Sequence, residues 1–138
     1  MSQAANAQIV QYIHSLPDDT TYIEIAYKGI TCLPDLSRFT CLKELDCSSN
    51  KLTELPKLNA SLKRLNCSNN QLYSLPELNE QLTQLDCYLN QLTELPKLNR
   101  ELIYLDCSSN QLTKLPEINV NLQYFNYEDN PLCCRTNL

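Results

Sequence analysis

Glycine and histidine each occur once in this chain of 138 residues, and tryptophan is absent. Loops that cradle phosphate, such as GxGxxG or the P-loop, need several residues without a Cβ atom, so a single glycine argues against them. A single histidine, His14, removes most metal sites and most catalysis by imidazole. We therefore expect no cofactor and no metal ion.

Basic residues are also scarce, since 11 Lys and Arg stand against 16 Asp and Glu, for a net charge of −5. Nucleic acid is bound by neutralising its phosphates with Lys and Arg, so this balance argues against a nucleic-acid partner. No apolar run approaches the roughly 20 residues that span a bilayer. The first ten residues lack the basic start and apolar stretch of a signal peptide. We expect an intracellular protein with no membrane partner.

Leucine, asparagine and cysteine are abundant, at 26, 15 and eight positions, because a unit of 20 residues repeats along most of the chain. The unit reads L-x-x-L-x-C-x-x-N-x-L-x-x-L-P-x-L-N-x-x. We predict a single domain, residues 1–138, divided into a capping helix (1–17), an irregular first repeat (18–41), four 20-residue repeats (42–121) and a partial last repeat with a tail (122–138).

Each unit predicts one coil of a solenoid. Leu45 and Cys47 are two residues apart, so a strand points both toward the same face, while Glu44, Asp46 and Ser48 point to solvent. The proline of each return arm forbids a regular helix and favours an extended, polyproline-like course. Stacked coils then form a curved parallel sheet of short strands on one side and extended arms on the other.

These motifs resemble the leucine-rich-repeat family, and within it the 20-residue class of bacterial type III effectors and of giant-virus repeat proteins. The resemblance covers about residues 20–132 and implies a repeat solenoid of the α/β class. In the effectors a second proline usually stands where this chain has Asn59, Asn79, Asn99 and Asn119. Many effectors also carry a ubiquitin-ligase domain, and we expect none here because no residues for one follow the repeats.

The asparagine that follows each strand recurs as a column: Asn50, Asn70, Asn90, Asn110 and Asn130. The resemblance implies that each amide lies buried at the turn and bonds backbone groups of its own and the adjacent coil. A buried turn leaves main-chain groups that need such partners. We call this set the asparagine column and interpret it as structural.

A second column consists of Cys47, Cys67, Cys87 and Cys107. The close cysteine pairs typical of zinc sites are absent, and in-register neighbours about 4.8 Å apart with parallel Cβ vectors fit a disulfide poorly. We interpret this cysteine column as small buried hydrophobes whose reduced thiols indicate a reducing compartment.

Four cysteines lie outside that column, and the sequence does not specify their roles: Cys32, Cys41, Cys133 and Cys134. A surface thiol in the tail could be lipidated, oxidised or bridge two chains. We expect the tail cysteines to occupy semi-buried positions at the end of the stack.

The two ends of the stack differ. A helix is predicted from Gln3 to Ser15, with Ile9, Tyr12 and Ile13 on an apolar face that covers the first repeat. No such segment follows the last repeat, so its strand edge is left open. Either nearby charges and proline blunt this edge, or a second copy covers it in a homodimer.

Variation between the repeats is concentrated at the outward strand positions, which makes the concave sheet face the candidate binding surface. It is acidic and carries tyrosines that supply contact area at low entropic cost. We therefore expect a protein partner with a basic or apolar surface, although the same residues could merely solvate the sheet. The predicted contact residues are Tyr22, Glu44, Asp46, Arg64, Asp86, Tyr88, Leu89, Tyr104, Asp106 and Tyr124.

A catalytic interpretation of this face is weak. Neighbouring strands would place Asp86 beside Asp106, and one of the two pKa values should rise, as in a glycosidase. A shallow face of short coils offers no closed pocket, however, so we expect no enzymatic activity.

Two functions fit the sequence. The first is a non-enzymatic protein–protein interaction module that binds through its concave sheet face, which fits a viral or pathogen protein that acts in a host cell. The alternative is a structural protein, of a virion or a scaffold, that self-assembles through its uncapped C-terminal edge. Either would act in the cytoplasm, the host cytoplasm or a virion.

Overall fold

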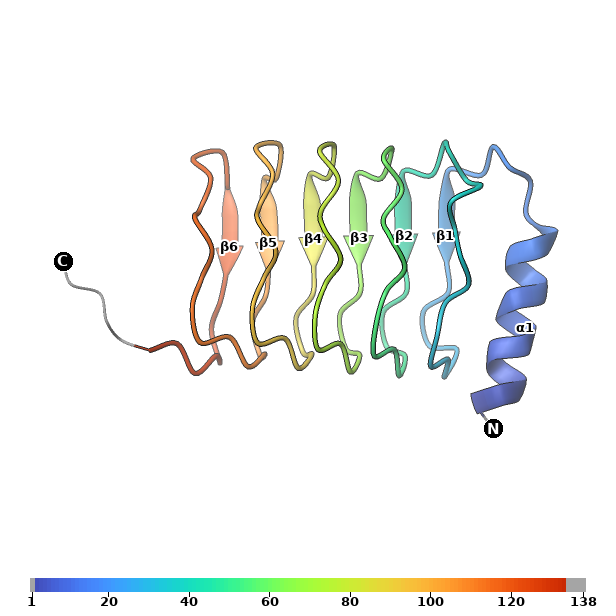
Figure 1. Cartoon of the computed structure of the whole chain (residues 1–138), viewed down its shortest axis with the longest axis horizontal. Coiled ribbons are helices and arrows are strands. Elements are labelled where there is room, and N and C mark those ends of the chain that lie inside the picture. Colours follow the sequence, from blue (N-terminus) through green and yellow to red (C-terminus); the bar gives the residue numbers. More distant parts are fainter. Residues whose placement is uncertain (1, 134–138) are drawn as a thin grey trace.

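The computed structural model describes residues 2–133, and the tail that includes Cys134 lies outside the described residues. Figure 1 shows a stack of coils with one helix at its N-terminal end. Within residues 2–133 the elements are α1 (Ser2–Ser15), β1 (Tyr22–Glu24), β2 (Glu44–Asp46), β3 (Arg64–Asn66), β4 (Gln84–Asp86), β5 (Tyr104–Asp106) and β6 (Tyr124–Asn126).

The six strands form one parallel sheet in sequence order, β1 to β6. Leu65 pairs with Leu85 and Leu85 with Leu105, so each strand is in register with the residue 20 positions further on. Only the first step differs, since Ile23 pairs with Leu45 across 22 residues. A return arm without regular secondary structure follows each strand (Figure 1). The predicted solenoid is confirmed.

The core is a narrow column between the sheet and the return arms. The middle residue of each of β1 to β5 is buried, and so are the cysteine that follows β2 to β5 and the first leucine of each return arm, as in Cys67 and Leu72. Because every coil places the same side chains at the same height, leucine contacts leucine and cysteine lies beside cysteine through the stack.

Asparagine amides satisfy the buried turns. The Nδ2 of Asn70 donates to the carbonyls of Cys47, Cys67 and Ser68 at 3.0, 3.1 and 3.2 Å, and its Oδ1 accepts from the N–H of Leu52 at 3.0 Å. Equivalent bonds recur at the other positions of the asparagine column. Each amide therefore joins the turn of its own coil to the coil before it.

A second set of asparagines, to which the sequence assigned no role, joins the coils on the opposite side. These are the residues that stand in place of the effectors' second proline. Asn99 donates through Nδ2 to the carbonyls of Asn79 and Leu82 at 2.7 and 3.0 Å, and Asn119 bonds Asn99 and Leu102 in the same way. A proline side chain has no donor, so these inter-coil bonds depend on the amide.

The cysteine column is buried, as the sequence predicts. Burial raises the pKa of Cys47 and of Cys107 to about 12, and it raises the pKa values of Cys67 and Cys87 well above the ordinary thiol range. All the cysteines in the described part of the chain are free thiols. These four thiols therefore stay protonated and act as apolar core groups.

Helix α1 covers the N-terminal end of the stack (Figure 1). Ile9 and Ile13, one turn apart, are buried against the first coil. The prediction for Tyr12 is wrong, because its side chain is 41% exposed. It lies at the edge of the buried stripe, in a groove that Glu24 and Lys28 also line.

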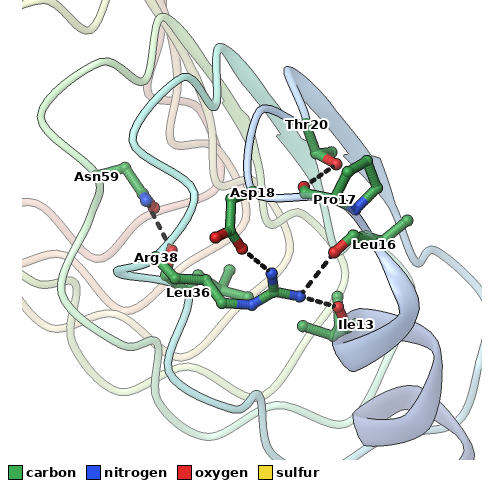
Figure 2. A network of polar contacts seen from close by, with 8 residues as sticks. All are labelled: Ile13, Leu16, Pro17, Asp18, Thr20, Leu36, Arg38 and Asn59. Atoms are coloured by element: carbon green, nitrogen blue, oxygen red, sulfur yellow. Dashed lines mark hydrogen bonds and ion pairs between the residues drawn. The ribbon is translucent and has the colours of Figure 1, made fainter.

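Arg38 attaches the end of α1 to the solenoid (Figure 2). Its guanidinium donates to the carbonyls of Ile13 and Leu16 at 2.6 and 3.0 Å and forms an ion pair with Asp18. The side chain also lies 4.1 Å from the centre of the Phe39 ring. A cation at the C-terminus of a helix satisfies its last carbonyls and opposes the helix dipole. The longer first repeat thus provides the residue that fixes the cap.

The C-terminal end has no comparable cover among residues 2–133. Ile118 is 38% exposed, whereas Leu98, at the same position of the preceding coil, is 6% exposed. Phe125 and Leu132 are likewise only partly buried. The semi-buried position predicted for Cys133 is wrong, since its side chain is exposed where the stack ends.

Replacing Asn70 by Ala removes a set of bonds that span two coils and leaves buried carbonyls without donors. We expect Asn70→Ala to lower the free energy of unfolding by about 3 kcal/mol, measured by urea denaturation. Gln71→Ala, which truncates an exposed amide one residue away, is the matched control and should stay near wild type. Equal stability of the two variants would contradict the structural role of the amide.

Thiol burial predicts two classes of cysteine. At about pH 8, N-ethylmaleimide should modify the exposed Cys32, Cys41 and Cys133 of the native protein rapidly, because only the accessible thiolate reacts. The cysteine column should react only after unfolding, and peptide mass spectrometry separates the two classes. Modification of Cys67 at the rate of Cys41 would contradict its burial.

Candidate functional site

The outward side chains of the strands line a groove of about 520 Å³ that runs across β1 to β5. It arises because the first and third residues of each strand point away from the core while the second points into it. Six of the predicted contact residues line it: Tyr22, Glu44, Asp46, Arg64, Asp86 and Tyr104.

The other four predicted contact residues do not line this groove. Tyr88 and Leu89 lie just past the end of β4 and are 39% and 48% exposed, while Asp106 and Tyr124 continue the face on β5 and β6. Asn66 and Gln84 line the groove although the sequence did not select them. Their outward positions in β3 and β4 could have identified them from the sequence.

Acidic groups dominate the groove, and its one cation is already paired. Arg64 Nη1 lies 3.5 Å from Glu44 Oε2. The third residues of β2 to β6 form a row across the sheet, in which Asn66 Nδ2 faces Asp46 Oδ2 at 3.5 Å and Asn126 Nδ2 faces Asp106 Oδ2 at 3.3 Å. Two aspartates of the row therefore have an amide from the following strand.

A serine two residues after the strand residue donates hydrogen bonds to most members of this row, and we call this contact the serine cap. Asp46 Oδ1 accepts from both the N–H and the hydroxyl of Ser48, at 3.0 and 2.7 Å, and Asp106 Oδ1 accepts from Ser108 in the same way. These contacts fold the serines down against the sheet, so their predicted outward, solvated position is wrong. The buried serines are Ser48, Ser68 and Ser108. Ala26, which follows β1 at the same position, is also buried.

The cap is missing at β4, where Tyr88 occupies the serine position. Asp86 Oδ1 is buried and has no hydrogen-bond partner among residues 2–133. Burial, followed by the charge of Asp106, raises the pKa of Asp86 to about 6. The expected rise for one member of the Asp86–Asp106 pair is therefore confirmed, and this carboxyl changes charge near neutral pH.

Aromatic rings border the acidic groove. The rings of Tyr104 and Tyr124 stack with centroids 4.5 Å apart and planes inclined by 7°. Burial and the charges of Asp86 and Asp106 raise the pKa of Tyr104 to about 12, so its hydroxyl remains a donor. Tyr22, at the other end of the groove, is 52% exposed. The face thus offers rigid aromatic contacts on either side of a row of carboxylates.

The described residues contain neither a cluster of possible metal ligands nor a helix that could cross a membrane. Between residues 2 and 133 no three side chains of His, Cys, Asp or Glu come together as metal ligands. In the same range α1 is too short and too polar to cross a bilayer. The groove is open along its length, which favours contact with a surface or an extended segment over enclosure of a small substrate.

Comparisons with known proteins agree with the repeat pattern. The model of the Leucine Rich Repeat family matches residues 41–59 and 61–80. No curated protein sequence matches the chain.

Solved structures give a broader likeness. The Shigella effector LRR domain is similar over 94% of this chain and 57% of its own length, with a TM-score of 0.82 and 25% identity. YopM from Yersinia enterocolitica is similar over 93% of this chain, with a TM-score of 0.69 and 30% identity. The functional domain of InlJ from Listeria monocytogenes, described as including a cysteine ladder, reaches a TM-score of 0.50 at 27% identity over 83% of this chain.

The chain spans 57% of the Shigella domain, 32% of the YopM chain and 36% of the InlJ domain. Likeness therefore extends along nearly all of this chain but only part of each relative. The 20-residue repeat, the parallel six-stranded sheet and the matching family model together show that the chain is similar to leucine-rich-repeat proteins of bacterial effectors.

Proposed function

We propose that this protein is a non-enzymatic protein–protein interaction module that binds a partner through its sheet face. The observation that carries the proposal is the groove across β1 to β5, with tyrosines at both ends and carboxylates between them. Tyrosine supplies large contact area with few rotatable bonds, and carboxylates steer a basic surface toward the groove. The solenoid holds these groups on a rigid sheet, so little conformational freedom is lost on binding.

The setting proposed for this interaction is the reducing interior of a host cell. Two of the similar structures are described as effectors of bacterial pathogens, one from Shigella and one from Yersinia pestis, which supports a pathogen protein that acts on a host protein. The free thiols among residues 2–133 support a compartment in which cysteines stay reduced.

The groove tyrosines provide the direct test. A double variant, Tyr22→Ser with Tyr104→Ser, should weaken capture of the partner from host-cell extract at least about thirtyfold, because the loss of even one such anchor costs about 2 kcal/mol or more. Tyr73→Ser is the matched control, since Tyr73 is 59% exposed and lies on a return arm. Circular dichroism should show the same fold for all three proteins.

Capture is compared by quantitative mass spectrometry of the bound fractions. Proteins retained by wild type and by Tyr73→Ser but lost with the double variant are the predicted partners. Equal retention by the double variant would show that the sheet face does not bind.

Self-assembly through the C-terminal edge is the second candidate function. It is favoured by the exposure of Ile118, at a position where the preceding coils have a buried leucine. It is also favoured by the position of β6 as the last strand of the described sheet. An edge strand with an exposed apolar end is a template for another chain. In this proposal a second copy of the chain covers the end.

Light scattering across the micromolar range tests this candidate. Under self-assembly the mass should rise with concentration, and the double variant Tyr127→Lys with Leu132→Lys should remain monomeric, because edge charges oppose pairing. Tyr73→Lys, far from the edge, should behave as wild type. A wild-type protein that stays monomeric throughout would contradict self-assembly.

A further inference from the structure

The serine that follows the row of polar residues at the strand ends is missing at β4. It is also missing at β1 and β6, but there the N–H groups of Ala26 and Glu128 donate to Glu24 and Asn126. In β2, β3 and β5 the third residue of the strand accepts hydrogen bonds from the N–H and hydroxyl of a serine two positions later. At β4 the equivalent position is Tyr88, which has no hydroxyl close to the backbone. Asp86 therefore lacks the serine hydroxyl from which Asp46 and Asp106 accept a hydrogen bond.

Neighbouring amides do not replace the missing cap. Asn66 pairs in register with Asp86, but its Oδ1 is held by Ser68 and its Nδ2 is turned toward Asp46. On the other side, Asn126 donates to Asp106. Asp86 thus lies between two Asp–Asn pairs without a side-chain donor of its own. The backbone N–H of Tyr88 lowers its pKa, but its Oδ1 is buried without a hydrogen-bond partner within residues 2–133. A buried acceptor without a donor is rare and calls for an explanation.

The residues that follow Asp86 are also unusual for their positions. Tyr88 and Leu89 are exposed, whereas Ser48, Ser68 and Ser108 at the first of these positions are buried. Leu89 has a φ of 55°, in the left-handed region that non-glycine residues seldom adopt; the positions 20 residues before and after it are Asn69 and Ser109. This coil therefore exposes an apolar pair beside the uncapped carboxyl.

Charge around Asp86 favours a cation. The charges of Asp106 on β5 and of Asp46 on β2 both raise the pKa of Asp86. Tyr104 lies in the same groove, and its hydroxyl stays protonated. Arg64 is the basic residue of the groove, and it is paired with Glu44. A positively charged donor would meet an unsatisfied carboxyl, two further carboxylates and no free cation among the groove residues.

We infer, on the basis of the proposed function, that the protein partner places a Lys or Arg side chain against Asp86. The cationic N–H groups donate to the Asp86 carboxylate where it lines the groove, and the aliphatic part of the side chain packs against the exposed rings and Leu89. Long basic side chains combine an apolar stem with a charged end, which matches this combination of an apolar rim and a carboxyl. Asp86 is the docking point for that side chain, and the rest of the groove binds the partner's neighbouring residues.

The direction of the pH dependence follows from linkage. Without a partner, Asp86 gains its proton near pH 6. A cation lowers the pKa of a neighbouring carboxyl, so the partner binds the ionised form more tightly than the protonated form. Binding is therefore strongest above about pH 7 and weakens as the pH falls through 6.

The test uses peptides selected from a random dodecapeptide phage library on the full chain at about pH 7.5. Peptides retained for analysis are those whose binding is lost in the Tyr22→Ser, Tyr104→Ser double variant. These should carry Lys or Arg, and Asp86→Asn should weaken their binding by about tenfold to a hundredfold, the range for a lost charge-assisted hydrogen bond. Affinities are measured by fluorescence anisotropy.

Two further variants separate a local contact from general electrostatics. Glu94→Gln removes the same charge from an exposed residue outside the groove and should change affinity by less than about threefold. Tyr88→Ser restores the cap seen at the other strands, so it should stabilise the fold and weaken peptide binding. For wild type, affinity should fall about tenfold between pH 7 and 5, and this fall should vanish in Asp86→Asn.

The outcomes are distinct. Selected peptides that lack basic residues, or that bind Asp86→Asn as tightly as wild type, would overturn the role of Asp86 and leave the sheet face as a binding surface. A selection in which no peptide depends on Tyr22 and Tyr104 would overturn the proposed function itself, and this inference with it.

Discussion

Four successive coils end in a turn whose backbone groups are buried, and in each of them one asparagine amide, that of Asn50, Asn70, Asn90 or Asn110, satisfies these groups across two coils at once. Asn70 alone bonds three carbonyls and one N–H. Because the amide must reach both coils, successive repeats can stack only in register. That register aligns the leucines and cysteines inside and, by the alternation of a strand, aligns the outward residues into rows. The candidate binding groove is thus a consequence of how the turns are satisfied.

Because the coils are nearly identical inside, a residue that departs from the repeat pattern changes the surface only at its own coil. Four coils share nearly the same interior, so the stack tolerates variation at the outward positions, as in Arg64, Gln84 and Tyr104. At β4 the variation extends to the serine position, which leaves Asp86 without its cap and exposes Tyr88 with Leu89. Real proteins depart from their own pattern mostly at functional sites, which is the physical reason for giving this coil particular weight.

Much of the architecture follows from the 20-residue period, because the period determines register and register determines which side chains stack. The sheet, the return arms and the buried cysteines are all predictable in this way. The hydrogen bonds within the outward rows cannot be predicted from the period. Alternation places Ser48 in solvent, yet a carboxyl two residues earlier holds it against the sheet. The bonds of Arg38 to α1, and the direction in which Asn66 turns its amide, depend on distances that a sequence pattern does not contain.

Native-state hydrogen exchange of the turn amides tests the central claim most directly. The N–H groups of Leu52, Leu72 and Leu92 donate to the Oδ1 of Asn70, Asn90 and Asn110 at 3.0 Å in each case. If these amides hold the coils in register, all three N–H groups should exchange slowly and with similar protection, close to that of the strand amides. Exchange at the rate of an exposed loop would show that the turns are not satisfied by the asparagines and would contradict the account.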